Sequence, residues 1–291
     1  MTEKKFYVYD GLNLKWKGSD GNWYVLSVRQ DTDPVSSYED FGFAAEMYCW
    51  HRNYNFGKSH NFASGDAFWE AMVEEYVSDS ELLEYAETGN IDGVTLTKNV
   101  DGTWDMVFRE YPDFSYENEK DWKIIREIMQ DLSEEDCQKL LKPYLEWMPV
   151  WMYDHSGQTI RCCDNNPFND RFDSGRLGII MIDKQKMLEE FEASDDNWRE
   201  KAREILATET AEYNEYVEGN VFGYFLYMFA GDEGEEDSLK CSCWEEFDTC
   251  AWGFTGNNIF ENGMIEDVGL GLEEALLSGN YEEVEFDTST L

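Results

Sequence analysis

The sequence predicts an α+β fold in which antiparallel sheets pack against amphipathic helices, arranged as two or three closely packed subdomains. Strand-like and helix-like patterns of apolar residues follow one another along the 291 residues. Although 30% of the residues are charged, 42% are hydrophobic and 16% are aromatic, which is enough for a substantial core. We place an N-terminal α+β subdomain over 1–148 and a C-terminal α+β subdomain with a strongly acidic end over 149–291.

The first elements of the N-terminal half are expected to be strands. Residues 5–30 alternate apolar and polar side chains, with Asp10-Gly11 and Asp20-Gly21 as turn signals. Apolar residues then recur every three or four positions over 38–54 and 66–88, a spacing that predicts helices with one buried face. A sheet should therefore be followed by a helical segment.

The same succession repeats before residue 148. Residues 94–111 predict a second hairpin, which turns at Asp101-Gly102. Helical spacing returns over 119–145, where Ser133 is followed three residues later by Asp136, an arrangement typical of a helix N-cap.

The C-terminal half is expected to begin with strands and loops. The segment 149–183 is rich in Gly, Asn and Asp and ends in a short apolar run that predicts a buried strand. A long amphipathic helix follows over 184–218, broken near Ser194 and stopped by Gly219. The apolar run VFGYFLYMF at 221–229 predicts another strand, with an acidic turn after it.

The charge is the most informative feature of the composition. The chain has 63 Asp and Glu against 23 Lys and Arg, a formal net charge of −40, which excludes simple nucleic-acid binding. No Lys or Arg follows Lys240. We therefore expect a partner-binding surface made of these carboxylates: Asp232, Glu233, Glu235, Glu236, Asp237, Glu245, Glu246, Glu266, Asp267, Glu273, Glu274, Glu282, Glu283 and Glu285.

The charge density invites a comparison with DNA. Duplex DNA carries one negative charge per roughly 1.7 Å of axis, so forty charges correspond to about 68 Å of duplex. A compact chain of this length would span about 50 Å, so its mean charge per unit length is similar. Such a surface should be steered quickly to the cationic groove of a DNA-binding protein. This favours a decoy over a catalyst.

A catalytic alternative rests on two histidine clusters. His51 and His60 flank one aromatic segment, and His155 follows Asp154, with Asp173 further along. Together these groups could serve a metal-assisted hydrolase, but none of their spacings is a known ligand signature. We therefore predict no metal, no cofactor and no catalytic residue, and expect a structural role for the five residues. A third alternative is an interaction protein that assembles through its aromatic surface.

Other features bear on the compartment. No apolar stretch reaches the roughly 18 residues of a membrane span, and the N-terminus lacks the apolar core of a secretory signal. Seven cysteines, an odd number without regular spacing, suit a reducing compartment. We expect a cytoplasmic protein with no membrane partner, and homo-oligomerisation stays open.

Five pieces of the sequence carry a resemblance to known proteins: CWHRNYNFG at 49–57, VWMYDHSG at 150–157, FDSGRLG at 172–178, EYNEYVEGNVFG at 212–223 and CAWGF at 250–254. Together they span about residues 49 to 256. They resemble a family of acidic hypothetical proteins from phages, prophages and conjugative elements of Gram-positive bacteria.

The resemblance supplies a biological context rather than an activity. Accessory genes of mobile elements often disarm host defence, and acidic proteins of this kind include antirestriction DNA mimics, CRISPR inhibitors and Gabija anti-defence proteins. The resemblance thus implies an anti-defence protein in the cytoplasm of a host bacterium. Its expected partner is a host defence nuclease or another DNA-binding protein, which this protein would inhibit by direct binding. Competition with DNA would test that expectation.

Overall fold

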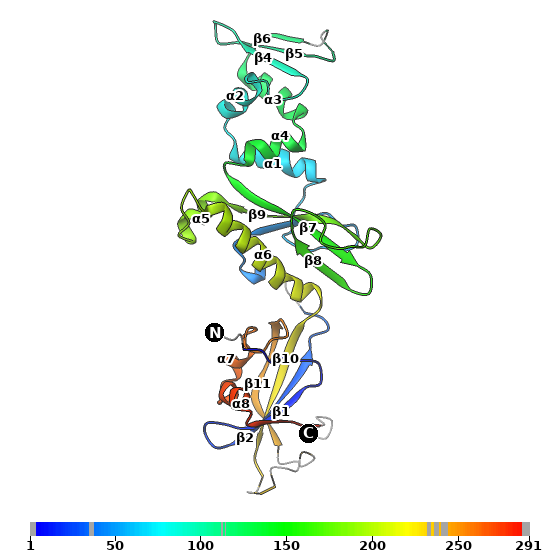
Figure 1. Ribbon diagram of the computed structural model, residues 1–291, viewed down its shortest axis with the longest axis vertical. Coiled ribbons are helices and arrows are strands. Elements are labelled where there is room, and N and C mark those ends of the chain that lie inside the picture. The colour runs from blue at the N-terminus through cyan, green and yellow to red at the C-terminus, as the bar shows by residue number, and fades with distance from the viewer. Residues whose placement is uncertain are drawn as a thin grey trace.

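Three bodies follow one another along the longest axis of the protein (Figure 1). The computed structural model describes residues 4–34, 38–111, 113, 115–231, 234–235, 239 and 244–286. The strands in these residues form three antiparallel sheets, one in each body. We call the bodies terminal, middle and distal, since the terminal body contains both ends of the described chain (Figure 1). The predicted α+β fold is confirmed.

The terminal body is built from the two ends of the described chain. Its five-stranded sheet has the order β11-β10-β2-β1-β12. The strands are β1 (Asn13–Lys17), β2 (Trp23–Gln30), β10 (Val221–Phe229), β11 (Trp244–Thr255) and β12 (Tyr281–Glu283). Two short helices, α7 (Met264–Val268) and α8 (Leu272–Ser278), pack on one face, where Trp16, Tyr24 and Tyr224 are buried.

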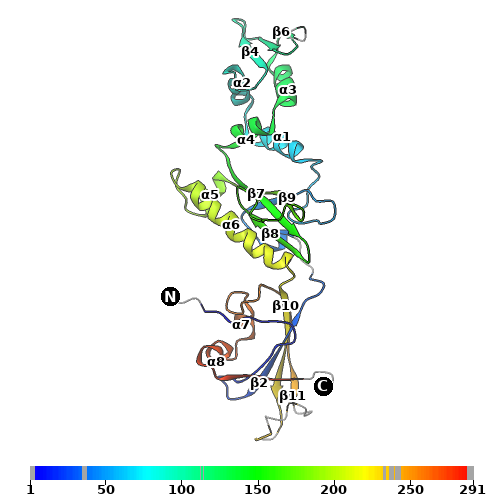
Figure 2. The same ribbon diagram turned by 45° about the vertical axis from the view of Figure 1, so that its right-hand side comes forward.

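The middle body contains the second sheet, with the order β3-β9-β7-β8. Its elements are η1 (Tyr38–Phe41), β3 (Glu46–Cys49), β7 (Leu145–Asp154), β8 (Gln158–Cys162), β9 (Ser174–Asp183), α5 (Lys184–Glu190) and α6 (Trp198–Val217). Helix α6 lies across this sheet (Figures 1 and 2), with Leu206 and Tyr213 buried in the core that the sheet contributes to.

The distal body comes from one continuous stretch between β3 and β7. Helices α1 (Gly65–Tyr76) and α4 (Glu134–Leu141) lie next to the middle body, and the third sheet lies at the far end (Figure 1). The other elements are α2 (Asp79–Glu87), β4 (Val94–Lys98), β5 (Trp104–Phe108), β6 (Ser115–Glu119) and α3 (Asp121–Asp131). Its core is continuous with Tyr48 and Ile179 of the middle sheet.

Most predicted elements are confirmed. The hairpins within 5–30 and 94–111 are present, and the helix over 66–88 is divided in two where Ser78 caps α2. Ser133 caps α4, with its hydroxyl accepting the Asp136 N–H and the Asp136 carboxylate accepting the Ser133 N–H.

The helix expected over 38–54 was wrong. This segment has only the short turn η1 and then β3, because Met47 and Cys49 pair with Ile180 and Gly178 of β9. The pairing is tight at Gly178, where a Cβ would lie 2.0 Å from the Tyr48 carbonyl oxygen. A glycine in β9 thus allows close approach of a strand from far away in the sequence.

The sheets do not follow the expected division at residue 148. Strands β1 and β2 pair with β12 and β10, and β3 pairs with β9, so both of these sheets combine residues from 1–148 and 149–291. Antiparallel pairing requires complementary apolar faces and register rather than neighbourhood in the sequence, which is why the division cannot be read from composition. No helix within the described ranges is long and apolar enough to cross a membrane.

Candidate partner-binding surface

The structure places the described members of the predicted acidic surface together on the terminal body. Glu245 and Glu246 lie on β11, Glu266 and Asp267 on α7, and Glu273 and Glu274 on α8. Glu282 and Glu283 lie on β12, Glu285 follows that strand, and Glu235 lies between β10 and β11. All ten are exposed. Asp232, Glu233, Glu236 and Asp237 lie outside the described residues.

Three of these ten carboxylates have partners within the protein. The Asp267 carboxylate accepts a hydrogen bond from the Tyr224 hydroxyl at 2.5 Å, and Glu283 accepts one from the Tyr9 hydroxyl at 3.2 Å. Glu273 forms an ion pair with Lys4 at 2.8 Å. Asp267 thereby joins α7 to β10, whereas Glu283 and Glu273 join β12 and α8 to the segment before β1. Since all three carboxylates have structural contacts, they are poor choices for testing partner binding.

Folding brings basic residues of the N-terminal segment into the same body as the acidic C-terminal quarter. The N-terminal segment that supplies β1 and β2 carries five Lys and Arg within residues 1–37, matched by five Asp and Glu. Together with 219–291, the two segments that contain the terminal body hold 22 acidic and 6 basic residues, a net charge of −16. The terminal body is therefore less purely anionic than the sequence after Lys240 suggests.

The distal body carries an almost equal negative charge on fewer residues. Segment 61–144 has 21 Asp and Glu against 7 Lys and Arg, a net charge of −14 over 84 residues. The segments of the middle body, 38–60 and 145–218, have a net charge of −10. Negative charge thus extends along the whole axis of the molecule. Sequence reasoning missed the distal contribution because its acids are interspersed with bases.

His51 and Asp154, one residue from each histidine cluster, belong to an ordered polar group at the end of β7. The Tyr54 hydroxyl lies 3.2 and 3.1 Å from the two Asp154 oxygens, and the Gln158 amide donates to Asp154 at 3.0 Å. His51 stacks on Tyr54 with ring centroids 5.0 Å apart. The Gln158 and Tyr54 hydrogen bonds, together with the field of His51, hold the pKa of Asp154 below its ordinary value. The group fastens the 51–56 loop to the β7–β8 hairpin.

His155 is not part of that group. His155 Nε2 lies 3.9 Å from Asp173 Oδ2, too far for a hydrogen bond, and the His155 ring stacks on Tyr153. The backbone N–H of Asp154 donates to the Asp173 carbonyl at 2.7 Å, which joins the β7 end to the loop before β9.

His60 lies among the aromatic rings of Tyr48, Trp50 and Phe62, near the distal body. Its Nε2 is 2.9 Å from the Cys49 carbonyl oxygen, while its buried Nδ1 has no hydrogen-bond partner. The five predicted residues are thus divided among three local environments. Within the described ranges, no three His, Cys, Asp or Glu side chains converge as a metal site would require. The hydrolase alternative gains no support from this geometry.

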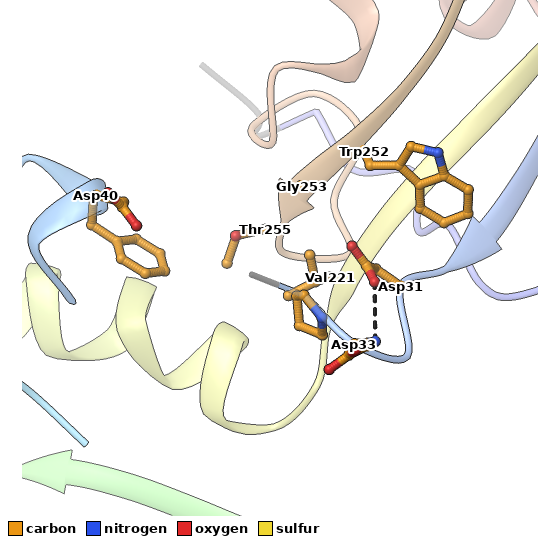
Figure 3. A pocket seen from close by; sticks show the side chains of 9 residues that line it. Asp31, Asp33, Asp40, Val221, Trp252, Gly253 and Thr255 are labelled. Carbon is orange, nitrogen blue, oxygen red and sulfur yellow. Dashed lines mark hydrogen bonds between the residues drawn. The ribbon is translucent and has the colours of Figure 1, made fainter. Parts of the chain in front are cut away.

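A cavity of about 480 Å³ lies at the joint between the terminal and middle bodies (Figure 3). Asp31, Asp33, Val221 and Trp252 contribute to it from the terminal side, and Asp40 from the middle body. The sequence contained one signal for this feature, a glycine at 223 inside an apolar strand, because such a glycine often marks close approach by another group.

Comparisons with known protein families, with curated proteins and with solved structures find no match for this chain.

Proposed function

We propose that this protein is an anti-defence inhibitor that binds the cationic DNA groove of a host DNA-targeting nuclease complex as an acidic DNA mimic. The observation that supports the proposal is the spread of net negative charge over all three bodies along one axis (Figure 1). A DNA groove presents Lys and Arg at intervals along a line, so an elongated anion can meet more of them than a compact one.

Binding would rely on charge complementarity rather than on one anchoring residue. Exposed carboxylates attract a cationic groove over about a Debye length, which is roughly 8 Å at physiological salt. They would then pair with Lys and Arg that normally contact phosphates, and duplex DNA would be excluded from the same groove. This mode inhibits the partner without any chemical step.

Competition with DNA tests the proposal directly. The chain is used to capture its partner from a host lysate at low salt, and the purified partner is then titrated with the protein and with duplex DNA. We expect mutually exclusive binding and a loss of affinity of at least about tenfold between 50 and 200 mM salt. Binding that persists at high salt, or a ternary complex with DNA, would contradict the proposal.

Matched sets of substitutions separate the surfaces. Six Glu→Gln changes on the terminal body avoid the three carboxylates with internal partners: Glu245, Glu246, Glu266, Glu274, Glu282 and Glu285. Six exposed residues of the distal body give the same change in net charge: Glu70, Glu74, Glu84, Glu87, Glu110 and Glu117.

The two sets distinguish local recognition from general charge. If the terminal surface contacts the groove, the terminal set should weaken binding at least about tenfold more than the distal set. Equal losses would indicate a groove that contacts the whole axis. Unchanged affinity in both variants would reject DNA mimicry and favour assembly through the aromatic surface.

A further inference from the structure

The cavity at the joint between the terminal and middle bodies contains a fixed aromatic wall. Trp252 remains 47% exposed although it lies on β11. A Cβ on Gly223 would lie 2.3 Å from Cε3 of the Trp252 ring, so only glycine allows the indole to lie against β10 here. Phe225 contacts the indole edge-on, with ring centroids 5.8 Å apart. The ring is therefore held in place before any ligand arrives.

The acidic wall of the same cavity is also fixed. The backbone N–H of Asp31 donates to the Val221 carbonyl at 2.8 Å, which attaches the segment after β2 to the start of β10. The Asp31 carboxylate accepts the Asp33 N–H at 3.1 Å (Figure 3). Asp40 enters from η1 on the opposite side, and none of the described lining residues is Lys or Arg.

We propose that this cavity binds one arginine side chain of the basic partner. The inference rests on the proposed function and names the point at which a single partner residue is recognised. An indole face attracts a cation, and carboxylates pair with a guanidinium in a planar, bidentate manner. Arginine combines stacking with two parallel hydrogen bonds, which a lysine ammonium does not. The volume of about 480 Å³ is within the usual range of ligand pockets.

Two of the sequence pieces described above meet at this cavity. The piece at 212–223 supplies Val221 to the cavity and ends at Gly223, and the piece at 250–254 supplies Trp252 and Gly253. Gly253, with a φ of 91°, takes a left-handed conformation next to the indole, which L side chains rarely adopt. The arrangement of Trp252 thus depends on a glycine in each piece.

A short peptide tests the cavity without the partner. The probe is acetyl-Gly-Gly-Arg-Gly-Gly-amide, and the control peptides contain citrulline or lysine in place of arginine. Binding is followed by fluorine NMR of the full chain labelled with 5-fluorotryptophan. The Trp252 signal is assigned from Trp252→Phe, which separates it from those of the other ten Trp. We expect the arginine peptide to shift this signal and to bind about tenfold more tightly than the citrulline peptide.

Two pocket variants and two controls complete the test. Trp252→Ala and Asp33→Asn should each weaken the arginine peptide about tenfold. Trp122→Ala and Glu84→Gln remove an exposed indole and one charge on the distal body and should leave binding unchanged. Asp33→Asn keeps every apolar contact, so it remains informative if Trp252→Ala does not fold.

The outcomes separate this inference from the proposed function. Equal binding of the arginine and citrulline peptides, or wild-type affinity in Asp33→Asn, would overturn the arginine site while leaving DNA competition untouched. Tighter binding of the lysine peptide would also overturn it. If the arginine peptide binds at Trp252 but the protein does not compete with DNA, the arginine site is supported and DNA mimicry is rejected.

Discussion

The terminal and distal bodies carry similar net negative charge, but one is built from two distant segments of the chain and the other from a single segment. The terminal sheet joins residues 13–30 to residues 221–283, whereas the distal body uses only the continuous stretch between β3 and β7. The terminal body has mainly strands, and the distal body has four helices among its described residues. Surface charge is therefore independent of how a body is assembled from the chain, whereas stability and folding depend on that assembly.

The two bodies also differ in how the N-termini of their helices are capped. In the distal body, Ser64, Ser78 and Ser133 cap α1, α2 and α4 through their hydroxyls. In the terminal body, α7 and α8 follow Gly263 and Gly271, which supply no side-chain cap. Three of the four described distal helices are therefore stabilised locally by a cap, whereas α3, which follows Lys120, and the two terminal helices depend on packing.

Removal of a core tryptophan should show whether the two bodies unfold separately. Trp16 is completely buried in the terminal core and Trp69 is 1% exposed in the distal core. Each substitution by Ala should lower the free energy of unfolding by about 3–5 kcal/mol. Hydrogen exchange should show loss of protection in β1, β2 and β10 for Trp16→Ala, with β4 and β5 still protected. Equal loss in all five strands would mean that the bodies unfold as one unit.

A helix cap tests the local stabilisation of the distal body. Ser133→Ala should lower the free energy of unfolding by about 1 kcal/mol in urea denaturation, because the capping hydrogen bond is lost. Gly271→Ala should cost a similar amount, about 1 kcal/mol, for a different reason. Gly271 has a φ of 79°, and a Cβ there would lie 3.1 Å from the Ser19 nitrogen.

Gly65→Ala is the control for these two variants. Gly65 begins α1, its φ is not left-handed, and a Cβ there would meet nothing within 4 Å. We expect this variant to be neutral or slightly more stable than the wild type. A loss as large as that of Gly271→Ala would refute the conformational explanation.

The smallest expected effect is the loss of stability when one aspartate in each of these bodies is protonated at low pH. The Tyr24 hydroxyl and Asn22 hold the pKa of Asp20 below its ordinary value, and the Asn118 N–H and Asn99 do the same for Asp105. A lowered native pKa gives stability that is present above the unfolded value of about 3.9 and lost as the pH falls through the native value.

NMR titration of both carboxyl groups checks this prediction. Asp20→Asn and Asp105→Asn should each be less stable than the wild type at pH 7, and the difference should vanish below the native pKa. A native pKa at or above 3.9 for either residue would show that its hydrogen bonds do not favour the ionised form.

The sequence predicted local elements better than their partners. The hairpin at Asp101-Gly102 and the capped helix at Ser133 depend on nearby residues, and both are confirmed. The strand at Met47 was mistaken for a helix because its pairing partner, Ile180, lies more than 130 residues away. Spacing of apolar residues over a short stretch cannot show which distant strand will cover them.

The candidate site was predictable only in part. The carboxylates from Glu245 to Glu285 do share one body, as their closeness in sequence suggested. The basic residues that accompany them, such as Lys4, reach that body only through folding. Gly223 indicates close approach by some other group, but the sequence does not identify Trp252 as that group, because only the antiparallel pairing of β10 with β11 brings the two together.

The pairing of β2 with β10 also has a consequence for synthesis. Arg29 pairs with Gly223, 194 residues further along the chain. At roughly 5–20 residues per second, the first hairpin must wait about 10–40 s on the ribosome for its neighbour. During that time Tyr24, Leu26 and Val28 lack both the strand that pairs with β2 and the helices α7 and α8 that complete their core. The formal charge of this segment, over residues 1–37, is zero. These apolar residues are therefore most open to association before the anionic C-terminal quarter has been made.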